Sequence, residues 1–173
     1  MKYGTMNYIK SDKGILMIKK NIRENDPNSG YFTLPGGKLE DYETGLNHPE
    51  GRLESSIREN PEETGIKPIN SILRGTILFD NKDRIFPNWK KKEDYLVYLF
   101  STTKYVGELK ESDEGIPVWV PESKIPSLQK NAGDNLMYGC LMDEKFKNGK
   151  NFMIVIKHKG NEIDEEGSLV DWF

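Results

Sequence analysis

Two stretches of this chain carry the residue types best suited to chemistry. The first is a Gly36-Gly37 turn that runs into a short acidic segment, and the second contains Glu59, Glu62 and Glu63. Residues spaced i, i+3 and i+4 share one face of a helix, where three carboxylates repel one another unless a cation lies among them. Carboxylate oxygens suit Mg²⁺ or Mn²⁺, which often take phosphate oxygens as further ligands. The pattern predicts a metal-dependent hydrolase of a phosphoanhydride.

The elements that position these residues can be predicted from hydrophobic periodicity and turn signals. A short strand over 31–34 leads into the glycine turn, and a helical pattern with Leu53 and Ile57 at i, i+4 begins near Pro49 and ends at Gly65. Other strands are expected at 3–9, 15–19, 70–79, 95–103, 116–120 and 152–157, and helical segments at 121–124 and 134–146. Interleaved strands and helices predict one mixed α/β domain spanning residues 1–173.

With both stretches in place, the sequence resembles the Nudix hydrolases, and more loosely their MutT/8-oxo-dGTP diphosphatase-like branch. The spacing from Gly37 to Glu43 matches the first half of the Nudix signature, and Arg58-Glu59-X-X-Glu62-Glu63-X-Gly65-Ile66 matches most of the second. The resemblance implies a Nudix-type α/β/α sandwich with a mixed central sheet. It also implies a pyrophosphohydrolase that acts on a nucleotide.

The signature differs from the family pattern in two ways. Seven extra residues separate Glu43 from Arg58, while Glu50 stands at the family's distance before Arg58. The box is therefore split over 36–66 by an inserted loop near 44–51, and either Glu43 or Glu50 fills the role of the first glutamate. In addition, Asn60-Pro61 stands among the expected metal ligands. A proline inside a helix costs about 3 kcal/mol, so we expect a kink there, or a fresh turn capped by Asn60.

The resemblance also implies roles for individual residues. The Gly37 carbonyl, Glu59, Glu62 and Glu63 would bind the metal, expected to be Mg²⁺ or Mn²⁺. Arg58 would orient a carboxylate. Either Glu62 or Glu114 would take the proton from the attacking water.

Recognition of the base is expected to involve residues outside the box. By resemblance to the MutT branch, Thr33 would meet the base, and Asp134 with Asn131 would contact a purine edge. Phe32 would stack on the base. Ordinary structural roles are also open. Asp134 could equally be a helix N-cap, and packing in the core is favoured over stacking for Phe32.

Composition narrows the possible partners. The 173 residues carry a formal net charge of −3, which does not favour a duplex nucleic-acid binder. The single cysteine, Cys140, excludes an internal disulfide or a zinc site built on cysteines. No apolar run is long enough to span a membrane, and we expect a cytoplasmic protein.

Three functions remain open from the residues. The first is hydrolysis of a nucleoside triphosphate, including oxidised purine nucleotides, to a monophosphate and pyrophosphate. The second keeps this chemistry but acts on ADP-ribose, a dinucleoside polyphosphate or an RNA cap. The third is a nucleotide-binding module with impaired catalysis, which the Asn60-Pro61 pair and the inserted loop would explain. The sequence allows a monomer or a homodimer.

Overall fold

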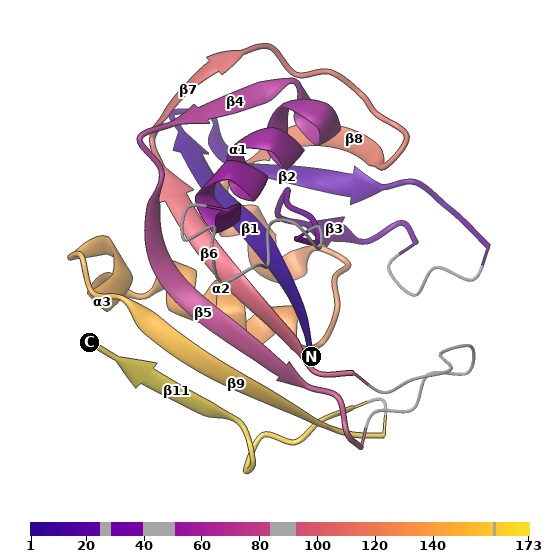
Figure 1. The fold of residues 1–173 in the computed structure, drawn as a ribbon, viewed down its shortest axis with the longest axis vertical. Coiled ribbons are helices and arrows are strands. Elements are labelled where there is room, and N and C mark those ends of the chain that lie inside the picture. Colours follow the sequence, from indigo (N-terminus) through magenta and orange to yellow (C-terminus); the bar gives the residue numbers. More distant parts are fainter. Residues whose placement is uncertain (25–28, 40–50, 84–92, 161) are drawn as a thin grey trace.

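A mixed β-sheet forms the centre of the protein (Figure 1). The computed structural model describes residues 1–24, 29–39, 51–83, 93–160 and 162–173. Its strands are β1 (Lys2–Ser11), β2 (Gly14–Lys20), β3 (Phe32–Thr33), β4 (Ile66–Ile69), β5 (Ile72–Asp80), β6 (Tyr95–Thr102), β7 (Lys104–Gly107), β8 (Gly115–Val120), β9 (Phe152–Lys159), β10 (Glu162–Ile163) and β11 (Leu169–Trp172). Its helices are α1 (Gly51–Thr64), the 3₁₀ helix η1 (Glu122–Ser127), α2 (Asp134–Met142) and α3 (Glu144–Lys147).

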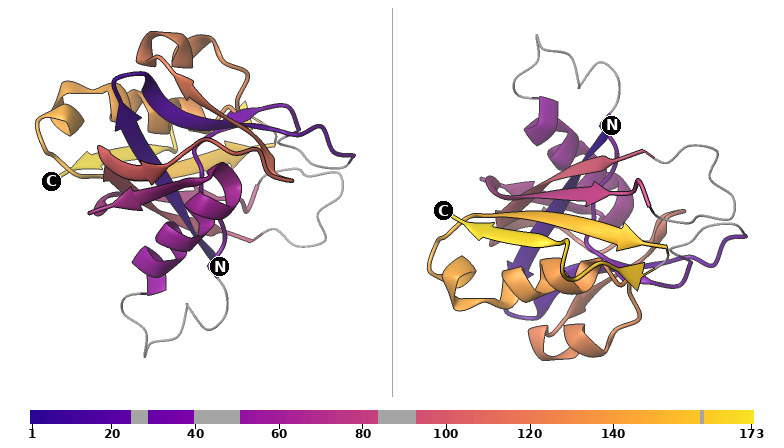
Figure 2. Two further views of the ribbon diagram at one scale, coloured as in Figure 1. Left: turned by 90° about the horizontal axis from the view of Figure 1, so that it is seen from above. Right: turned by 90° about the horizontal axis from the view of Figure 1, so that it is seen from below.

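The strands of the main sheet follow the order β10-β9-β5-β6-β1-β2-β3, with β11 also paired to β9 and β8 to β2. The pairs β1–β6 and β5–β9 are parallel and the others are antiparallel. Helix α1 covers one face of the sheet, and η1, α2 and α3 cover the other (Figure 2). The predicted α/β/α sandwich with a mixed sheet is therefore confirmed.

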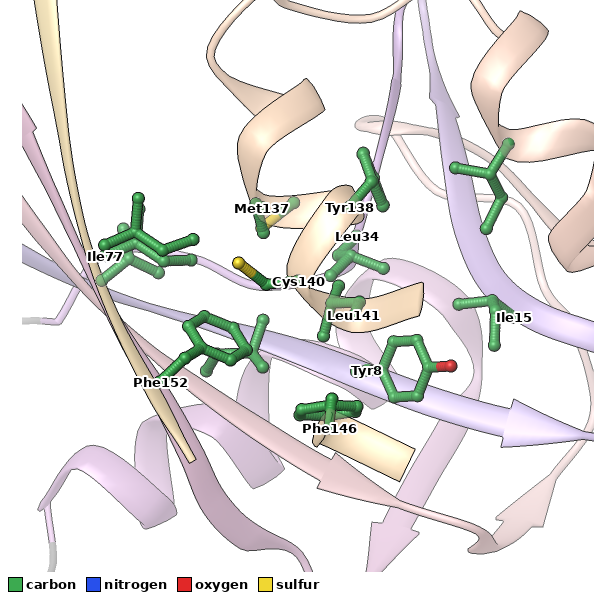
Figure 3. Packing of buried hydrophobic residues seen from close by; sticks show 14 of the residues in the cluster. Tyr8, Ile15, Leu34, Ile77, Met137, Tyr138, Cys140, Leu141, Phe146 and Phe152 are labelled. Atoms are coloured by element: carbon green, nitrogen blue, oxygen red, sulfur yellow. The ribbon is translucent and has the colours of Figure 1, made fainter. Parts of the chain in front are cut away.

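The main core lies between the sheet and helices α2 and α3 (Figure 3). Phe152 and Ile154 from β9 are fully buried there, and Phe146 from α3 packs against them. Full burial of a side chain of this size contributes about 1.5–3 kcal/mol. Phe152 also explains Gly75 on the neighbouring strand, because a Cβ at that position would lie 2.6 Å from the phenyl ring.

The opposite face, between α1 and β1, is held by polar groups. The Ser56 hydroxyl donates to Asn7 Oδ1, and Asn7 Nδ2 lies 3.4 Å from the Ser56 carbonyl oxygen. Asn60 Nδ2 also donates to that carbonyl, at 3.1 Å. All three side chains are buried. Hydrogen bonds are directional, so the two contacts between Ser56 and Asn7 help to determine which face of α1 turns towards the sheet, while the Asn60 contact lies within the helix.

We expect Ser56→Ala to destabilise the protein by about 1–3 kcal/mol, because the buried Asn7 Oδ1 would lose its donor. Urea unfolding monitored by circular dichroism would measure this change. Ser127→Ala is the matched control, since the Ser127 hydroxyl donates to the Lys124 carbonyl at an exposed position. Equal stabilities of the two variants would contradict a structural role for the polar contact.

The predicted strands are confirmed, including the hairpin of β1 and β2. The predicted helix over 134–146 is instead two helices, because Asp143 is extended and its side chain accepts from the Lys145 N–H to begin α3. The acidic C-terminal segment contains the strand β11, which periodicity did not reveal. Among the described residues, no helix combines the length and the apolar character needed to cross a membrane.

Candidate active site

The glycine turn lies directly beside β1. The Thr5 N–H donates to the Gly37 carbonyl at 2.9 Å, and the Asn7 N–H donates to the Pro35 carbonyl at 2.8 Å. β1 pairs with β2 only through Lys10 and Ser11, so its remaining edge is open to the segment that carries the turn. The turn is therefore fixed to the centre of the sheet.

Two carboxylates of α1 reach this turn. Glu63 accepts a hydrogen bond from the Gly36 N–H, with 2.8 Å between N and Oε2. A Cβ placed on Gly37 would lie only 2.7 Å from Glu59 Oε1 and closer still to the rest of that carboxyl group. Gly36 has a φ of 152° and its missing Cβ would meet the backbone of Thr5. Gly36 is therefore required by close approach to the backbone and by its conformation, whereas Gly37 leaves room for the Glu59 carboxyl group.

Arg58 lies between the carboxylates of Glu59 and Glu62. Its Nη2 is 2.9 Å from Glu59 Oε1, and its Nη1 is 3.4 Å from Glu62 Oε2. The Glu62 side chain is 62% exposed, whereas that of Glu59 is 17% exposed. The structure thus brings Glu59 and Glu63 to the turn and leaves Glu62 at the solvent edge, connected to Glu59 through Arg58.

A lysine that sequence reasoning missed lies within this group. Lys20 Nζ is 2.9 Å from Glu114 Oε2 and 3.8 Å from Glu63 Oε1. Arg23 also reaches Glu114, at 3.4 Å between Nη1 and Oε1. The only signal in the sequence was that two lysines, Lys19 and Lys20, close an otherwise apolar strand.

The two carboxylates around Lys20 are perturbed in opposite directions. Burial raises the pKa of Glu63 to about 7, even though Lys20 and the Gly36 N–H act against this rise. Glu59 and Glu114 add to the rise because they carry like charge. The hydrogen bond from Lys20 lowers the pKa of Glu114, with a smaller contribution of the same sign from Arg23. Glu63 is therefore the carboxylate whose negative charge is least well compensated.

Glu59 has a further neighbour in Tyr95 at the start of β6. Burial raises the pKa of the Tyr95 phenol to about 12, and the charge of Glu59 adds to that rise. A Cβ on Gly4 would collide with the Tyr95 hydroxyl and would lie 2.8 Å from the Gly37 carbonyl oxygen. Gly4 therefore lets Tyr95 and the turn approach each other.

Helix α1 continues through Pro61 to Thr64 as one element. The expectation that Asn60 caps a separate turn is therefore wrong. Hydrogen bonds on both sides of the proline explain this continuity, since Asn60 Nδ2 donates to the Ser56 carbonyl and Thr64 Oγ1 to the Asn60 carbonyl at 2.7 Å. Glu59 and Glu63 consequently lie on consecutive turns of one helix.

Glu59 and Glu63 are chemically suited to bind a hard divalent cation, because they offer carboxylate oxygens at a partly buried position. Across the ranges that the structure describes, however, no three His, Cys, Asp or Glu side chains converge closely enough to hold a metal ion. The cations Arg58 and Lys20 lie beside these carboxylates instead. Glu43, Glu50 and nearly all of the predicted loop near 44–51 fall outside the described residues.

The predicted base-contacting residues lie on two adjoining segments. The Phe32 N–H donates to the Gln129 carbonyl at 2.9 Å, which places β3 beside the segment that leads through Asn131 into α2. Phe32 packs partly against the main core, and Thr33 is half-buried. Asp134 is buried at the first position of α2, after Gly133 as N-cap, so the alternative of an N-cap role for Asp134 is wrong.

Comparison with known proteins agrees with this arrangement. The NUDIX domain family matches residues 3–138. The chain belongs to the Nudix family. It is 30% identical over 137 residues to the uncharacterized Nudix hydrolase YvcI of Bacillus subtilis (strain 168), covering 78% of this chain and 75% of that protein. These matches identify the chain as a Nudix pyrophosphohydrolase.

Solved structures share the Nudix fold. A MutT protein from Bacillus halodurans superposes with a TM-score of 0.73 at 24% identity, over 99% of this chain and 98% of that one. A bifunctional NMN adenylyltransferase/ADP-ribose pyrophosphatase from Francisella tularensis, complexed with AMP and a Mn ion, has a TM-score of 0.57 at 22% identity. That match covers 83% of this chain and 41% of the larger protein.

Proposed function

We propose that this Nudix enzyme hydrolyses nucleoside triphosphates, including oxidised purine nucleotides, to the monophosphate and pyrophosphate. The observation that carries the proposal is the placement of Glu59 and Glu63 on consecutive turns of α1, each against one glycine of the Gly36-Gly37 turn. The MutT-like character of the sequence supports a triphosphate substrate. The net charge of −3 supports a single nucleotide rather than a duplex as the partner.

Glu59, Glu63 and the Gly37 carbonyl are the groups proposed to hold Mg²⁺ or Mn²⁺. The Gly37 oxygen accepts one hydrogen bond, from Thr5, and a carbonyl oxygen has a second lone pair. Glu62 would join these ligands by turning its exposed side chain away from Arg58. When bound, such an ion neutralises phosphate oxygens and stabilises the charge that develops during hydrolysis.

Arg58 and Glu62 are proposed to complete the catalytic group. Arg58 would hold Glu59 in orientation through the 2.9 Å ion pair already present. Between the two candidates for the proton acceptor, we favour Glu62 over Glu114. The hydrogen bond from Lys20 lowers the pKa of Glu114 and occupies its carboxylate, whereas the Glu62 side chain is mostly exposed at the edge of the site.

Thr33, Phe32, Asn131 and Asp134 are proposed to line the position of the base. Their support is that β3 and the segment before α2 adjoin each other. We also propose that residues 1–173 act as one domain, because β9, which follows the family match, pairs with β5 inside the sheet.

ADP-ribose is a second candidate substrate, supported by the likeness to the Francisella tularensis protein. A panel of nucleoside triphosphates, oxidised purine triphosphates, ADP-ribose and dinucleoside polyphosphates, assayed with Mg²⁺ or Mn²⁺, would separate the two. Release of pyrophosphate from a triphosphate is the expected result, and turnover of ADP-ribose alone would overturn it.

We expect Glu62→Gln to lower kcat by about 10²- to 10⁴-fold on the preferred substrate, as loss of a proton acceptor does. Steady-state kinetics would measure this loss, with Glu114→Gln assayed beside it. If Glu114→Gln costs more in kcat than Glu62→Gln, the assignment of the proton acceptor must be reversed.

A further inference from the structure

The Lys20 ammonium occupies an unusual position, between two carboxylates at the proposed metal site. It lies 2.9 Å from Glu114 Oε2 and 3.8 Å from Glu63 Oε1, and the lysine side chain is only 17% exposed. Lysine side chains normally keep their charged ends in water. The burial of this lysine beside two carboxylates indicates that the site requires positive charge.

The fold places Lys20 there through strand pairing. Lys20 is the last residue of β2 and pairs with Gly115 of β8. Gly115 directly follows Glu114 in the sequence, so this pairing brings Lys20 next to Glu114. The next backbone N–H, that of Asn21, donates to the Glu114 carbonyl at 3.1 Å. The neighbouring Lys19 points to the other side of the strand and is exposed. Only one of the two adjacent lysines therefore reaches the carboxylates.

We propose that Lys20 is a built-in counter-ion, which neutralises Glu63 and Glu114 in the metal-free enzyme and opposes the binding of the divalent cation. This inference rests on the metal site proposed above. The nearly buried Glu63 carboxylate has Glu59 and Glu114 as like-charged neighbours. The ammonium compensates for this repulsion until a divalent ion with twice the charge takes over that role.

Removal of the Lys20 ammonium is expected to destabilise the metal-free enzyme but to strengthen its binding of the metal ion. Without metal, removal of the ammonium leaves Glu63 and Glu114 to repel each other, which lowers stability. With metal, removal of the ammonium also removes a cation that repels the incoming ion. The ammonium lies 3.8 Å from Glu63 Oε1, so its repulsion acts directly on an ion bound to that carboxylate.

The test compares Lys20→Met and Lys20→Gln with Lys19→Met, the adjacent exposed lysine, and with the wild type. Isothermal titration at pH 8 would give the Kd for Mn²⁺, and thermal unfolding would be followed in EDTA and in saturating Mn²⁺. We expect both Lys20 variants to bind Mn²⁺ about tenfold more tightly. They should unfold at a lower temperature than Lys19→Met in EDTA, and Mn²⁺ should raise their unfolding temperature by more than it raises that of the wild type.

Two failures can be told apart by the same titrations. If the wild type binds Mn²⁺ and Glu59→Gln weakens that binding, but the Lys20 variants bind no more tightly than Lys19→Met, then the proposal for Lys20 is wrong and the metal site stands. If the wild type and every variant fail to bind Mn²⁺, the proposed metal site itself is wrong, and the role of Lys20 falls with it. The lysine at position 20 would also lose its proposed role if its replacement left the unfolding temperature in EDTA equal to that of Lys19→Met.

Discussion

Glu63→Gln is expected to lower kcat/KM on the preferred nucleotide by at least about a hundredfold. Substitution of residues that support metal ligands typically lowers metal affinity or activity by about 10- to 100-fold. Glu63 is itself proposed as a ligand, so we expect a loss at or above the upper end of this range. Glutamine retains an oxygen that can accept from the Gly36 N–H, so the turn should keep its conformation. The loss would then report the missing charge, and titration with Mn²⁺ should show weaker binding in the variant.

The same substitution has a second consequence in the metal-free protein. The pKa of Glu63 is raised from 4.5 to about 7, so the folded state keeps this proton longer than the unfolded state does. The stability that this group contributes is therefore fully present below pH 4.5 and is lost as the pH rises to about 7. A change of this size corresponds to a contribution of about 3 kcal/mol.

Glutamine cannot titrate, so the Glu63→Gln variant should lack this decline. We expect it to be more stable than the wild type above pH 7 in EDTA, although it is nearly inactive. Urea unfolding at pH 5 and pH 8 would measure the difference. Glu62→Gln is the control, because the Glu62 side chain is mostly in solvent, and its stability should follow the wild type across this range. A stability of Glu63→Gln that declines from pH 5 to pH 8 as steeply as that of the wild type would contradict the burial of a charge at this position.

Gly37→Ala is expected to have the second large effect. The new methyl group would occupy the space of the Glu59 carboxyl group, lying 2.7 Å from Oε1 if nothing moved. Glu59 would have to leave the turn, carrying its ion pair with Arg58 away from Glu63. We expect kcat/KM to fall by about a hundredfold or more, because the two proposed ligands would no longer converge.

The cost in stability should be more moderate than the cost in activity. Overpacking of a rigid core costs about 1–3 kcal/mol, and we expect a loss no larger than the lower end of this range, because the Glu59 carboxyl group is the end of a flexible side chain. Gly139→Ala is the matched control, since nothing lies within 4 Å of a Cβ at that position on α2. Alanine is the better helix former, so Gly139→Ala should be neutral or stabilising by up to about 1 kcal/mol. If Gly37→Ala retained full activity, Glu59 would have no role at the turn.

The sequence by itself determined the family and the mixed α/β fold, and it predicted the residues that we propose for the chemistry. The glycine turn and the acidic helix are local features. The spacing of the glutamates follows the 3.6-residue repeat of a helix, and the turn follows from the backbone conformations that glycine can adopt. Most strands of the main sheet were equally readable, because alternating or continuous apolar residues marked them. The short strands β4 and β7, which pair with each other, were not predicted.

Only the tertiary structure decided where the side chains of those residues lie relative to the turn. Glu62 and Glu63 differ by about 100° around the helix axis, and the buried hydrogen bonds between Ser56 of α1 and Asn7 of β1 help to select which of them faces the turn. Lys20 reaches Glu114 because β2 pairs with β8, a contact between residues more than ninety positions apart. Such a pairing leaves no trace in local periodicity. The sequence therefore predicts which groups are suited to the chemistry. Long-range packing selects the carboxylates that reach the turn, and it places Lys20 between Glu63 and Glu114.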